Sequence, residues 1–501
     1  MPNMCQLTKT YFPKSKCRCG AYLTVYLTLT LTVVLSLCLT LIEGTRQNGI
    51  YLEAECVTDI GLNSVLAEYH RELLAQYDLF AIDSSYGTSL PQVENTKKRL
   101  EFYLNRNLSR DDVFLNGLLY RDFLGMRLKS AGIQKARFLT DDGGRVLRLR
   151  AAEAALDEYN LSLLKELQGW MEVVESERLL ERDIAAEKKK LDKKLDGYGG
   201  EKQISENEWI TIDVKNPTDS LEKMRKKGIL KLVVEDVSQL SDKKLSDKNL
   251  IGSRIKAGSC NQGNLSLGAD ERTQVDDLME RFLFQEYLFM HMGRYGEERE
   301  EHSLAYQMEY LLGGKASDVE NLTLVVKCIF AMREAANTIY LYSDNTKKQA
   351  AHTLAAVLAS AMLVPEATDV LEGILILGWA FTESLYDVKS LLAGKRIPLM
   401  KAKDTWHYDL KLALSPGNIS ESDAGKGLYY VDYLRLLLML EQEQTIINRA
   451  MNMVEADIRQ TPGNEDFRLD GCLDAIEVNV NIDSAYGYDC QFIRRKGYST
   501  Q

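Results

Sequence analysis

Residues 21–42 read AYLTVYLTLTLTVVLSLCLTLI, twenty-two positions without a charged side chain. About 20 apolar residues are enough to cross the hydrocarbon core of a bilayer as a helix. A cleaved secretory signal usually has a shorter apolar region, of roughly 7 to 15 residues, followed by a small-x-small site. Here the run ends in Leu41-Ile42-Glu43-Gly44-Thr45, without such a site. The sequence therefore predicts an uncleaved transmembrane helix over residues 21–42.

The residues that flank this helix predict its orientation. Only Arg46 is basic among the first 15 residues after the helix. Lys and Arg in short loops favour the cytoplasmic side of a membrane. We therefore expect a basic cytoplasmic leader at 1–20, a single pass through the plasma membrane and an extracytoplasmic body. The leader contains no acid and four basic residues, which serve as topology determinants: Lys9, Lys14, Lys16 and Arg18.

Small hydroxyl residues recur every fourth position within the apolar run, which places them along one ridge of a helix. Small residues let two helices approach closely in lipid, and their hydroxyl groups can bond between helices. The alternative is that each hydroxyl bonds the carbonyl four residues earlier in its own helix and marks no partner. The pattern predicts membrane-helix packing through Thr24, Thr28, Thr32, Ser36 and Thr40.

Composition describes the rest of the chain as a folded, acidic protein. Of its 501 residues, 45% are hydrophobic and 27% charged, which excludes wholesale disorder and a multi-span transporter. The net charge is −11, and because the first 20 residues hold four basic side chains and no acid, the other 481 carry −15. An acidic body binds polyanions poorly, so we expect no nucleic-acid partner.

Periodicity after the apolar run predicts a helical stem and a small sheet over residues 43–155. Residues 48–76 have apolar side chains at helical spacing and no proline, so the transmembrane helix is expected to continue into an amphipathic stem. Residues 77–83 have the pattern of a short buried strand. Residues 136–149 contain two strand-like runs around Asp142-Gly143, which is a strong hairpin signal.

The middle of the chain divides into a charged part and a helical part. Residues 156–268 are expected to hold a charged helix at 172–196 and a polar linker with a short strand at 230–234. Residues 269–462 have apolar spacings of three and four over long stretches, which predicts a helical bundle. Its most apolar stretch, 374–381, is too short to span a membrane and predicts a central core helix.

The C-terminal residues 463–501 change to the alternation typical of strands. Apolar and polar side chains alternate over 472–482, and a second strand pattern follows a turn at 488–495. We expect a β-hairpin that joins the sheet begun near residues 77 and 136, which makes the bundle an insertion. The expected fold class is α+β, mostly helical, with one N-terminal transmembrane helix continuing into an amphipathic stem, a small antiparallel sheet and a large helical insertion.

Several segments together resemble an uncharacterised family of clostridial membrane proteins. The resemblance covers most of the chain, and the family is distantly similar to the TadE/TadG pseudopilin-like proteins of tight-adherence pilus systems. The segments that carry it are KCRCGAYLTVYL at 16–27, LIEGTR at 41–46, LEAECVTDIGLNSVLAEYHRELLAQYDLFAIDSSYG at 52–87, REAAN at 333–337, GWAFTESLYDVKSLLAGKRIPLMK at 378–401 and FRLDGCLDAIEVNV at 467–480.

The resemblance implies an integral-membrane component of a pilus or secretion-type apparatus, without enzymatic activity. Prepilins of this kind are cut after a glycine that precedes the apolar helix, and Gly20 after a basic stretch resembles that position. Val25 stands where such prepilins usually carry an acid, which departs from the pattern. Whether the leader is cleaved at Gly20 is therefore left open.

Residue patterns for catalysis or metal binding are sparse. His291 and His302 bracket four glutamates, but eleven residues of helix would separate the two rings by ~16 Å. Residues 423–427 (DAGKG) lack the earlier glycine and the following Ser/Thr of a phosphate-binding loop. No nucleophile motif is present. We therefore expect a protein that is not an enzyme and has no catalytic residue, no metal site and no cofactor.

Five cysteines follow the membrane segment, an odd number that does not suggest a disulfide framework. Cys472 and Cys490 could pair only if their hairpin were centred near residue 481, whereas the turn residues favour a centre nearer Ser484. Solitary buried thiols are the expected arrangement, with this bridge as the alternative.

The favoured hypothesis is a single-pass membrane protein with an extracytoplasmic body, a non-catalytic component of a pilus or secretion-type assembly. Its partners would be the lipid bilayer and other membrane or pilus-assembly proteins, contacted through the transmembrane helix and stem. One alternative is a surface-tethered hydrolase that uses carboxylates such as Asp59, Asp78 or Asp83. The other is a ligand-binding ectodomain.

Overall fold

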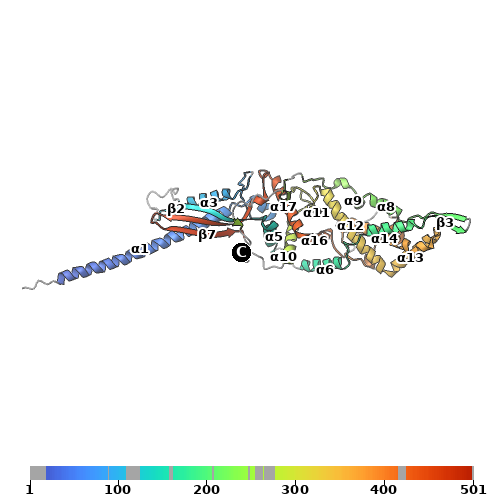
Figure 1. The fold of residues 1–501 in the computed structure, drawn as a ribbon, viewed down its shortest axis with the longest axis horizontal. Coiled ribbons are helices and arrows are strands. Elements are labelled where there is room, and N and C mark those ends of the chain that lie inside the picture. Colours follow the sequence, from blue (N-terminus) through green and yellow to red (C-terminus); the bar gives the residue numbers. More distant parts are fainter. Residues whose placement is uncertain are drawn as a thin grey trace, which may run out of the picture. The chain divides into compact units, whose positions relative to one another are not determined.

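The chain forms two compact units in a computed structural model (Figure 1). The first unit comprises Met1–Ala67, Thr96–Gln134 and Glu477–Arg495, and the second comprises Glu68–Asn95, Lys135–Ile476 and Lys496–Gln501. Strands β2 and β6 contribute residues to both units. The structure describes residues 19–88, 90–108, 124–156, 162–205, 208–245, 249–253, 263–264, 277–415 and 425–498.

Helix α1 (Cys19–Leu66) dominates the first unit. Its 48 residues make a rod about 72 Å long at 1.5 Å per residue. Within the described part of the chain, residues 22–66 are the single helix whose length and composition suit a membrane span. Such a helix fits a membrane anchor and also a signal sequence. The predicted continuation of the apolar helix into the stem is confirmed as far as Leu66.

The two parts of α1 differ in burial. Side chains from Tyr22 to Ile42 are exposed or half-buried, whereas the stem buries a stripe with spacings of three and four residues. This stripe is the signature of an amphipathic helix lying on a core. Ile60, one of the apolar residues that suggested the stem, is 47% exposed and lies outside the stripe. The stripe consists of Ile50, Ala54, Val57, Thr58, Gly61, Leu62 and Val65.

Helix α3 (Val93–Leu108) approaches α1 closely at Gly61, within the first unit. A Cβ atom on Gly61 would lie 2.8 Å from Cδ2 of Leu104, inside normal contact distance. Glycine at this position therefore lets the two helices pack at short range.

The sheet has the hydrogen-bonded order β1-β6-β2-β5, and β7 also pairs with β6. Its strands are β1 (Ile82–Asp83), β2 (Met126–Phe138), β5 (Gly263–Asn264), β6 (Cys472–Ser484) and β7 (Asp489–Gly497). The predicted C-terminal hairpin is confirmed, and it joins a sheet with strands from residues 82 and 126 onward. The helical bundle is thus an insertion between β2 and β6, as expected.

The helices predicted between residues 273 and 460 form most of the second unit (Figure 1). Helix α14 packs against α12 and α13, and its residues 374–381 are all buried, which confirms the predicted core helix. Helix α17 ends directly before Thr461 and Pro462, where proline is expected to stop it. The helices are α10 (Asp277–His291), α11 (Gln307–Gly313), α12 (Asp318–Ser343), α13 (Asn345–Ala361), α14 (Thr368–Leu392), α15 (Leu410–Leu414), α16 (Tyr430–Leu440) and α17 (Glu443–Gln460).

The hairpin predicted at 136–149 is wrong. The first run is the end of β2, but the second lies in helix α5 (Asp141–Ala155), which packs on α10 and α17. Asp142-Gly143-Gly144 has positive φ throughout, so the turn leads into a helix. A larger residue would also clash at position 144, because a Cβ atom on Gly144 would lie 2.6 Å from Ile447 Cγ2. The alternation after the turn lasts only a few residues, and the alanine-rich segment beyond it favours helix.

Two further strand predictions need correction. Residues 230–234 were expected to be a strand, but Ile229–Val233 forms the short helix α9, which packs on α12 and α14. A short apolar run is compatible with either structure, and tertiary packing decides between them. In the segment 77–83, Tyr77 ends helix α2 (Arg71–Tyr77), Asp78 caps it with φ 49°, and only Ile82–Asp83 is strand.

The charged segment is also more structured than expected. Two helices, α6 (Ser162–Ser176) and α7 (Ile184–Asp196), replace the single helix predicted at 172–196. Lys188 of α7 is buried and paired with Asp192 and Glu222, at 2.9 and 3.2 Å. The expected linker holds a two-stranded antiparallel hairpin, β3 (Gly200–Ser205) with β4 (Glu208–Ile212), and helix α8 (Asp219–Lys226).

Replacing Leu375 by alanine tests the role of α14 as the core helix. Leu375 is fully buried, so the substitution is expected to lower the free energy of unfolding by about 2 to 5 kcal/mol. The measurement is denaturant unfolding of the full chain in detergent, followed by circular dichroism. Leu412→Ala is the control, because Leu412 is 58% exposed and should change stability by less than about 0.5 kcal/mol. Equal effects of the two substitutions would contradict the assignment.

Candidate functional site

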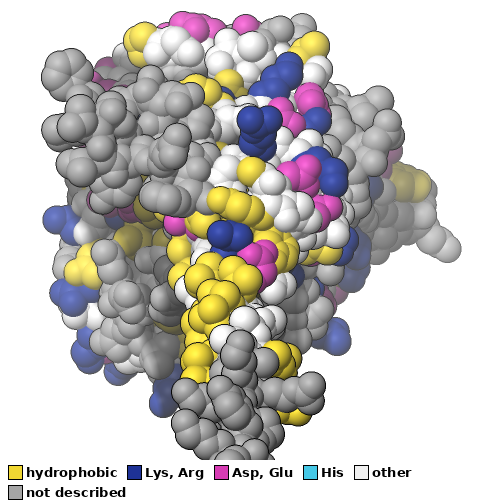
Figure 2. Space-filling model, turned by 90° about the vertical axis from the view of Figure 1, so that its left-hand side faces the viewer, with side chains coloured by type: hydrophobic (Ala, Val, Ile, Leu, Met, Phe, Trp, Pro, Cys, Tyr) yellow, Lys and Arg dark blue, Asp and Glu magenta, His cyan; other side chains and the backbone are white. Residues whose placement is uncertain are grey.

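The predicted packing ridge lies on the apolar part of α1. All five of its residues are exposed, and Figure 2 shows hydrophobic side chains gathered along this helix. Thr28 Oγ1 donates to the carbonyl of Thr24 at 3.0 Å, Thr32 to that of Thr28 at 2.7 Å, and Thr40 to that of Ser36 at 2.8 Å. The hydrogen-bonding capacity of these hydroxyl groups is thus used within their own helix. A partner helix would therefore benefit from the small size of these side chains.

The leader residues Lys9, Lys14, Lys16 and Arg18 lie outside the described residues, so the topology that they predict remains a prediction. Gly20 lies in the first turn of α1, where only the backbone is described. Cleavage at Gly20 also remains a prediction.

Beyond the apolar part, contacts within the first unit fix α1 to the hairpin β6–β7. Glu43 accepts a hydrogen bond from Tyr488 Oη at 2.5 Å and pairs with Arg46 at 2.7 Å. The guanidinium carbon of Arg46 lies 4.2 Å from the ring centroid of Tyr486, at the tip of the hairpin. The hydrogen bond to Glu43 raises the pKa of Tyr488. We call these four residues the collar.

Further along α1, at Tyr51 and Glu55, the contacts become apolar as well as charged. The rings of Tyr51 and Phe492 lie 5.1 Å apart between centroids, and Arg494 pairs with Glu55. Together with the buried stripe, these contacts hold the stem against strand β7. The apolar part of α1 is therefore the continuation of a helix whose other half is fixed in a folded unit.

The carboxylates named for the hydrolase alternative have separate environments. Asp78 is 67% exposed at the side chain and lies 3.6 Å from Nε2 of His291. Asp83 accepts from the backbone N–H of Ser85 at 2.8 Å and from its hydroxyl at 2.6 Å, and it lines a groove of about 380 Å³. Asp59 is half-buried on α1 in the first unit. The structure does not bring Asp78 and Asp83 to one site, and the hydrolase alternative remains a prediction.

His291 and His302 do not form one site. Nδ1 of His291 lies 2.8 Å from the carbonyl of Gln76, and Nδ1 of His302 lies 2.7 Å from Oε1 of Gln307. The ring of Tyr77 is 6.0 and 6.2 Å from the two imidazoles between centroids. Each histidine thus has its own partners in the core of the second unit.

Cys472 and Cys490 are both free thiols. The backbone N–H of Ser484 donates to the carbonyl of Tyr488 at 2.9 Å, so the hairpin is centred on Tyr486 and does not place the two cysteines opposite each other. Burial raises the pKa of both thiols. The expectation of solitary buried thiols is confirmed for this pair, and the bridge is excluded.

A buried ionic network joins α12, α14 and the segment after α14. Asp387 lies between Arg333 Nη2 at 3.0 Å and Lys401 Nζ at 2.6 Å, and it accepts from Asn337 at 2.9 Å. Lys401 also pairs with Glu383. Burial acts to raise the pKa of Asp387, but the two cations outweigh it and lower that pKa. The network carries two positive and two negative charges in the core, an arrangement that stabilises packing when every partner is present.

Sequence analysis missed this network although it quoted the segments that supply it. Arg333 and Asn337 lie one turn apart, whereas Asp387 and Lys401 lie more than 50 residues further along the chain. The sequence did contain a signal: Arg333 and Asp387 lie among apolar residues of helices that were expected to be buried. Lys, Arg, Asp and Glu are almost never fully buried unless paired, so each of the two needed a partner.

A second buried carboxylate, Glu309 on α11, has no cation partner among the described residues. Its Oε1 accepts from the backbone N–H of Tyr295 at 3.0 Å and from Tyr430 Oη at 2.8 Å. Its Oε2 is buried without a hydrogen-bond partner in the described part of the chain. Burial raises the pKa of Glu309 to about 7.

Among the described residues, one group of His, Asp and Glu side chains could hold a metal ion: His352, Asp369 and Glu372. Sequence analysis missed it, because His352 lies on α13 and the two acids on α14. The local signal was the three-residue spacing of Asp369 and Glu372, which puts both carboxylates on one face of a helix.

Comparison with known families assigns the chain to one of them. A family model matches residues 207–484, more than half of the chain. The chain belongs to DUF5702, a family of unknown function. Neither a curated protein nor a solved structure matches the chain. The DUF5702 match contains helices α10–α17 and strand β6, and it leaves out the apolar helix α1 and the helices α5–α7.

Replacing Glu309 by glutamine tests its raised pKa. Because the folded-state pKa is raised from 4.5 to about 7, the stability that Glu309 contributes is present below pH 4.5 and is lost as the pH rises through about 7. Glutamine cannot ionise, so the variant should gain stability relative to the parent over this range, by up to roughly 3 kcal/mol.

Denaturant unfolding of the full chain at pH 5 and pH 8 measures this difference. Glu320→Gln is the control, because Glu320 is exposed on α12. If parent and Glu309→Gln lost or gained stability in parallel between the two pH values, the assignment of a protonated buried Glu309 would be wrong.

Proposed function

We propose that this protein is a single-pass plasma-membrane protein whose extracytoplasmic body acts as a non-catalytic component of a pilus or secretion-type assembly. The amino-terminal leader lies in the cytoplasm in this proposal. Partners are the lipid bilayer and other membrane or pilus-assembly proteins, which pack against α1.

The observation that carries the proposal is the contrast between the two parts of α1. One helix without a break presents 21 exposed or half-buried, uncharged residues from Tyr22 to Ile42 and then a stripe buried in the first unit. An exposed apolar surface of this size is costly in water and stable in lipid. The rigid connection to the stem means that a force or displacement on the helix reaches the folded unit directly.

A pilus or secretion-type assembly is supported by the resemblance of several sequence segments to a membrane-protein family that is distantly similar to TadE/TadG pseudopilin-like proteins. In this chain the stem of α1 is held against the β6–β7 hairpin, so the apolar helix is held at a defined angle to its own unit. An assembly built by lateral packing of such helices requires this, because each subunit must present its folded unit in the same orientation as its neighbours.

The ridge of small residues is the contact proposed within the membrane. Positions four apart on a helix are offset by about 40° around its axis, so consecutive residues of the ridge lie nearly in line and can contact the same partner helix. The threonine methyl groups and the Ser36 side chain occupy little space, which allows close backbone approach.

A photoreactive side chain placed at Thr28 or Thr32 tests this contact. Crosslinks to a partner helix are expected in membranes at both positions. Val34 is the matched control, since it lies in the same apolar run about 200° around the helix from Thr32 and should crosslink mainly to lipid. The double variant Thr28→Leu/Thr32→Leu is expected to weaken assembly severalfold. No partner at either position, together with normal assembly of the double variant, would contradict the proposal.

Native cysteines test the proposed topology. Cys56 and Cys328 are exposed thiols on the extracytoplasmic side in this proposal. A membrane-impermeant maleimide added to intact cells should label them, and Cys56→Ala/Cys328→Ala should reduce the labelling. Cys17 and Cys19 of the leader should react only after the cells are opened. Labelling of the leader but not the body in intact cells, or recovery of the protein from the medium, would refute the orientation.

A further inference from the structure

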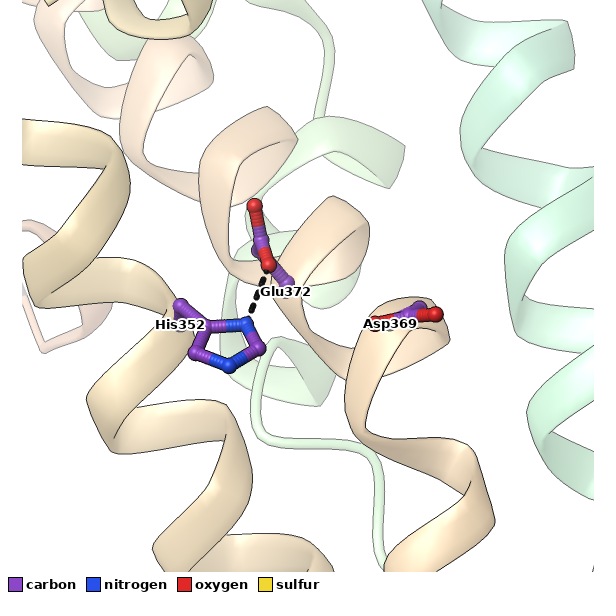
Figure 3. Close-up of side chains that lie close together, drawn as sticks. All are labelled: His352, Asp369 and Glu372. Carbon is purple, nitrogen blue, oxygen red and sulfur yellow. Dashed lines mark hydrogen bonds and ion pairs between the residues drawn. The ribbon is translucent and has the colours of Figure 1, made fainter. Parts of the chain in front are cut away.

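Helices α13 and α14 bring one imidazole and two carboxylates together at the surface of the second unit. Nδ1 of His352 lies 2.7 Å from Oε2 of Glu372, and Asp369 lies one turn earlier on α14 (Figure 3). One ligand atom from each of the three residues lies within 4.8 Å of the other two. His352 is 43% exposed at its side chain and Glu372 is 13% exposed, so the group is open to solvent on one side.

The charges of this group are not balanced by the protein. Asp369 and Glu372 are three residues apart on one helix, where two carboxylates repel each other. Neither has a Lys or Arg nitrogen within 4.0 Å among the described residues, and Glu372 is hydrogen-bonded to the ring of His352. By contrast, the carboxylates of the buried network are all paired with Lys or Arg. A cation would supply the missing positive charge.

The ligand types indicate which cation suits the group. One imidazole nitrogen with carboxylate oxygens favours a divalent transition metal, whereas Ca²⁺ takes six to eight oxygen ligands. In a tetrahedral zinc site the ligand atoms lie ~3.4 Å apart, given bonds of about 2.1 Å. Here Nδ1 of His352 and Oε2 of Glu372 are closer than that, at 2.7 Å, and one ligand atom from each residue lies within 4.8 Å of the others. Rotation of the side chains could therefore enclose an ion. Three protein ligands leave a fourth position for water.

The backbone beneath the group is fixed by packing. Ala351 and Ala355, which flank His352 on α13, are fully buried, as is Leu371 next to Glu372 on α14. Pro365 begins the short 3₁₀ turn that joins the two helices, so their relative position is set close to the group. Ion binding would therefore need side-chain rotation and no rearrangement of the helices.

We infer that His352, Asp369 and Glu372 bind a Zn²⁺ ion that links α13 to α14. The ion is held by Nδ1 or Nε2 of His352 and one oxygen of each carboxylate, with water in the open position. Its effect is to join two helices that pack on each other, which stabilises this end of the bundle. The inference does not depend on the membrane location of the protein, so it can fail or succeed separately from the proposed function.

Zinc binding to the full chain in detergent is the test. The protein is purified without a histidine tag, stripped with a chelator and titrated with ZnCl₂ alone, with metal content measured by mass spectrometry. Cys17→Ser/Cys19→Ser forms the background, because the leader thiols could also bind zinc. One tightly bound ion per chain is expected. His352→Ala should lose it, and Asp369→Asn or Glu372→Gln should weaken binding by at least tenfold.

Gln349→Ala is the matched control, since Gln349 is exposed on α13 one turn before His352 and offers no metal-ligand atom of the expected kind. Zinc should raise the unfolding temperature of the parent and of Gln349→Ala, but not that of His352→Ala. Circular dichroism confirms that His352→Ala is folded. The inference is overturned if the parent binds no ion, if His352→Ala binds zinc as well as the parent, or if Gln349→Ala loses as much affinity as His352→Ala.

Discussion

The continuity of helix α1 is the constraint on which the first unit depends. A backbone in hydrocarbon must satisfy its own hydrogen bonds, and a helix does so without outside partners. In α1 the same hydrogen-bonded rod runs on into a buried stripe, so the apolar part and the stem cannot move independently without breaking the helix. The hydroxyl groups of Thr28, Thr32 and Thr40 follow the same rule, because each bonds a carbonyl of its own helix.

The collar and the hairpin explain how distant parts of the sequence make this unit. Glu43 and Arg46 meet Tyr488 and Tyr486, more than 400 residues further along the chain. For this contact to form, the chain must come back to α1 at β6–β7, after the whole helical insertion. The insertion between β2 and β6 must therefore keep its two ends close together, and the adjacent pairing of β2 with β6 meets that condition. A fold with long-range closure of this kind is expected to form slowly.

Sequence analysis succeeded where one-dimensional periodicity decides the structure. The unbroken apolar helix, the core segment of α14, the end of α17 before Pro462 and the C-terminal hairpin were all predictable. It failed where packing chooses between two structures compatible with a short pattern, as in α5 after Asp142-Gly143 and in α9. It also could not foresee clusters whose members lie on different helices. His352 with Glu372, and Arg333 with Asp387, become neighbours only when the bundle forms.

Two buried networks of paired charges in the second unit have a structural role. Asp474 lies between Arg137 and Arg150, and Asp387 lies between Arg333 and Lys401, all of them buried. A proton transfer in such a network would leave an unpaired charge in the core, which is strongly unfavourable. These groups are therefore suited to holding the fold and unsuited to acid–base chemistry with a substrate. The group on α13 and α14 is different, because Asp369 is exposed and neither of its carboxylates pairs with a Lys or Arg among the described residues. A bound cation would give these carboxylates the positive partner that Lys and Arg side chains supply in the core.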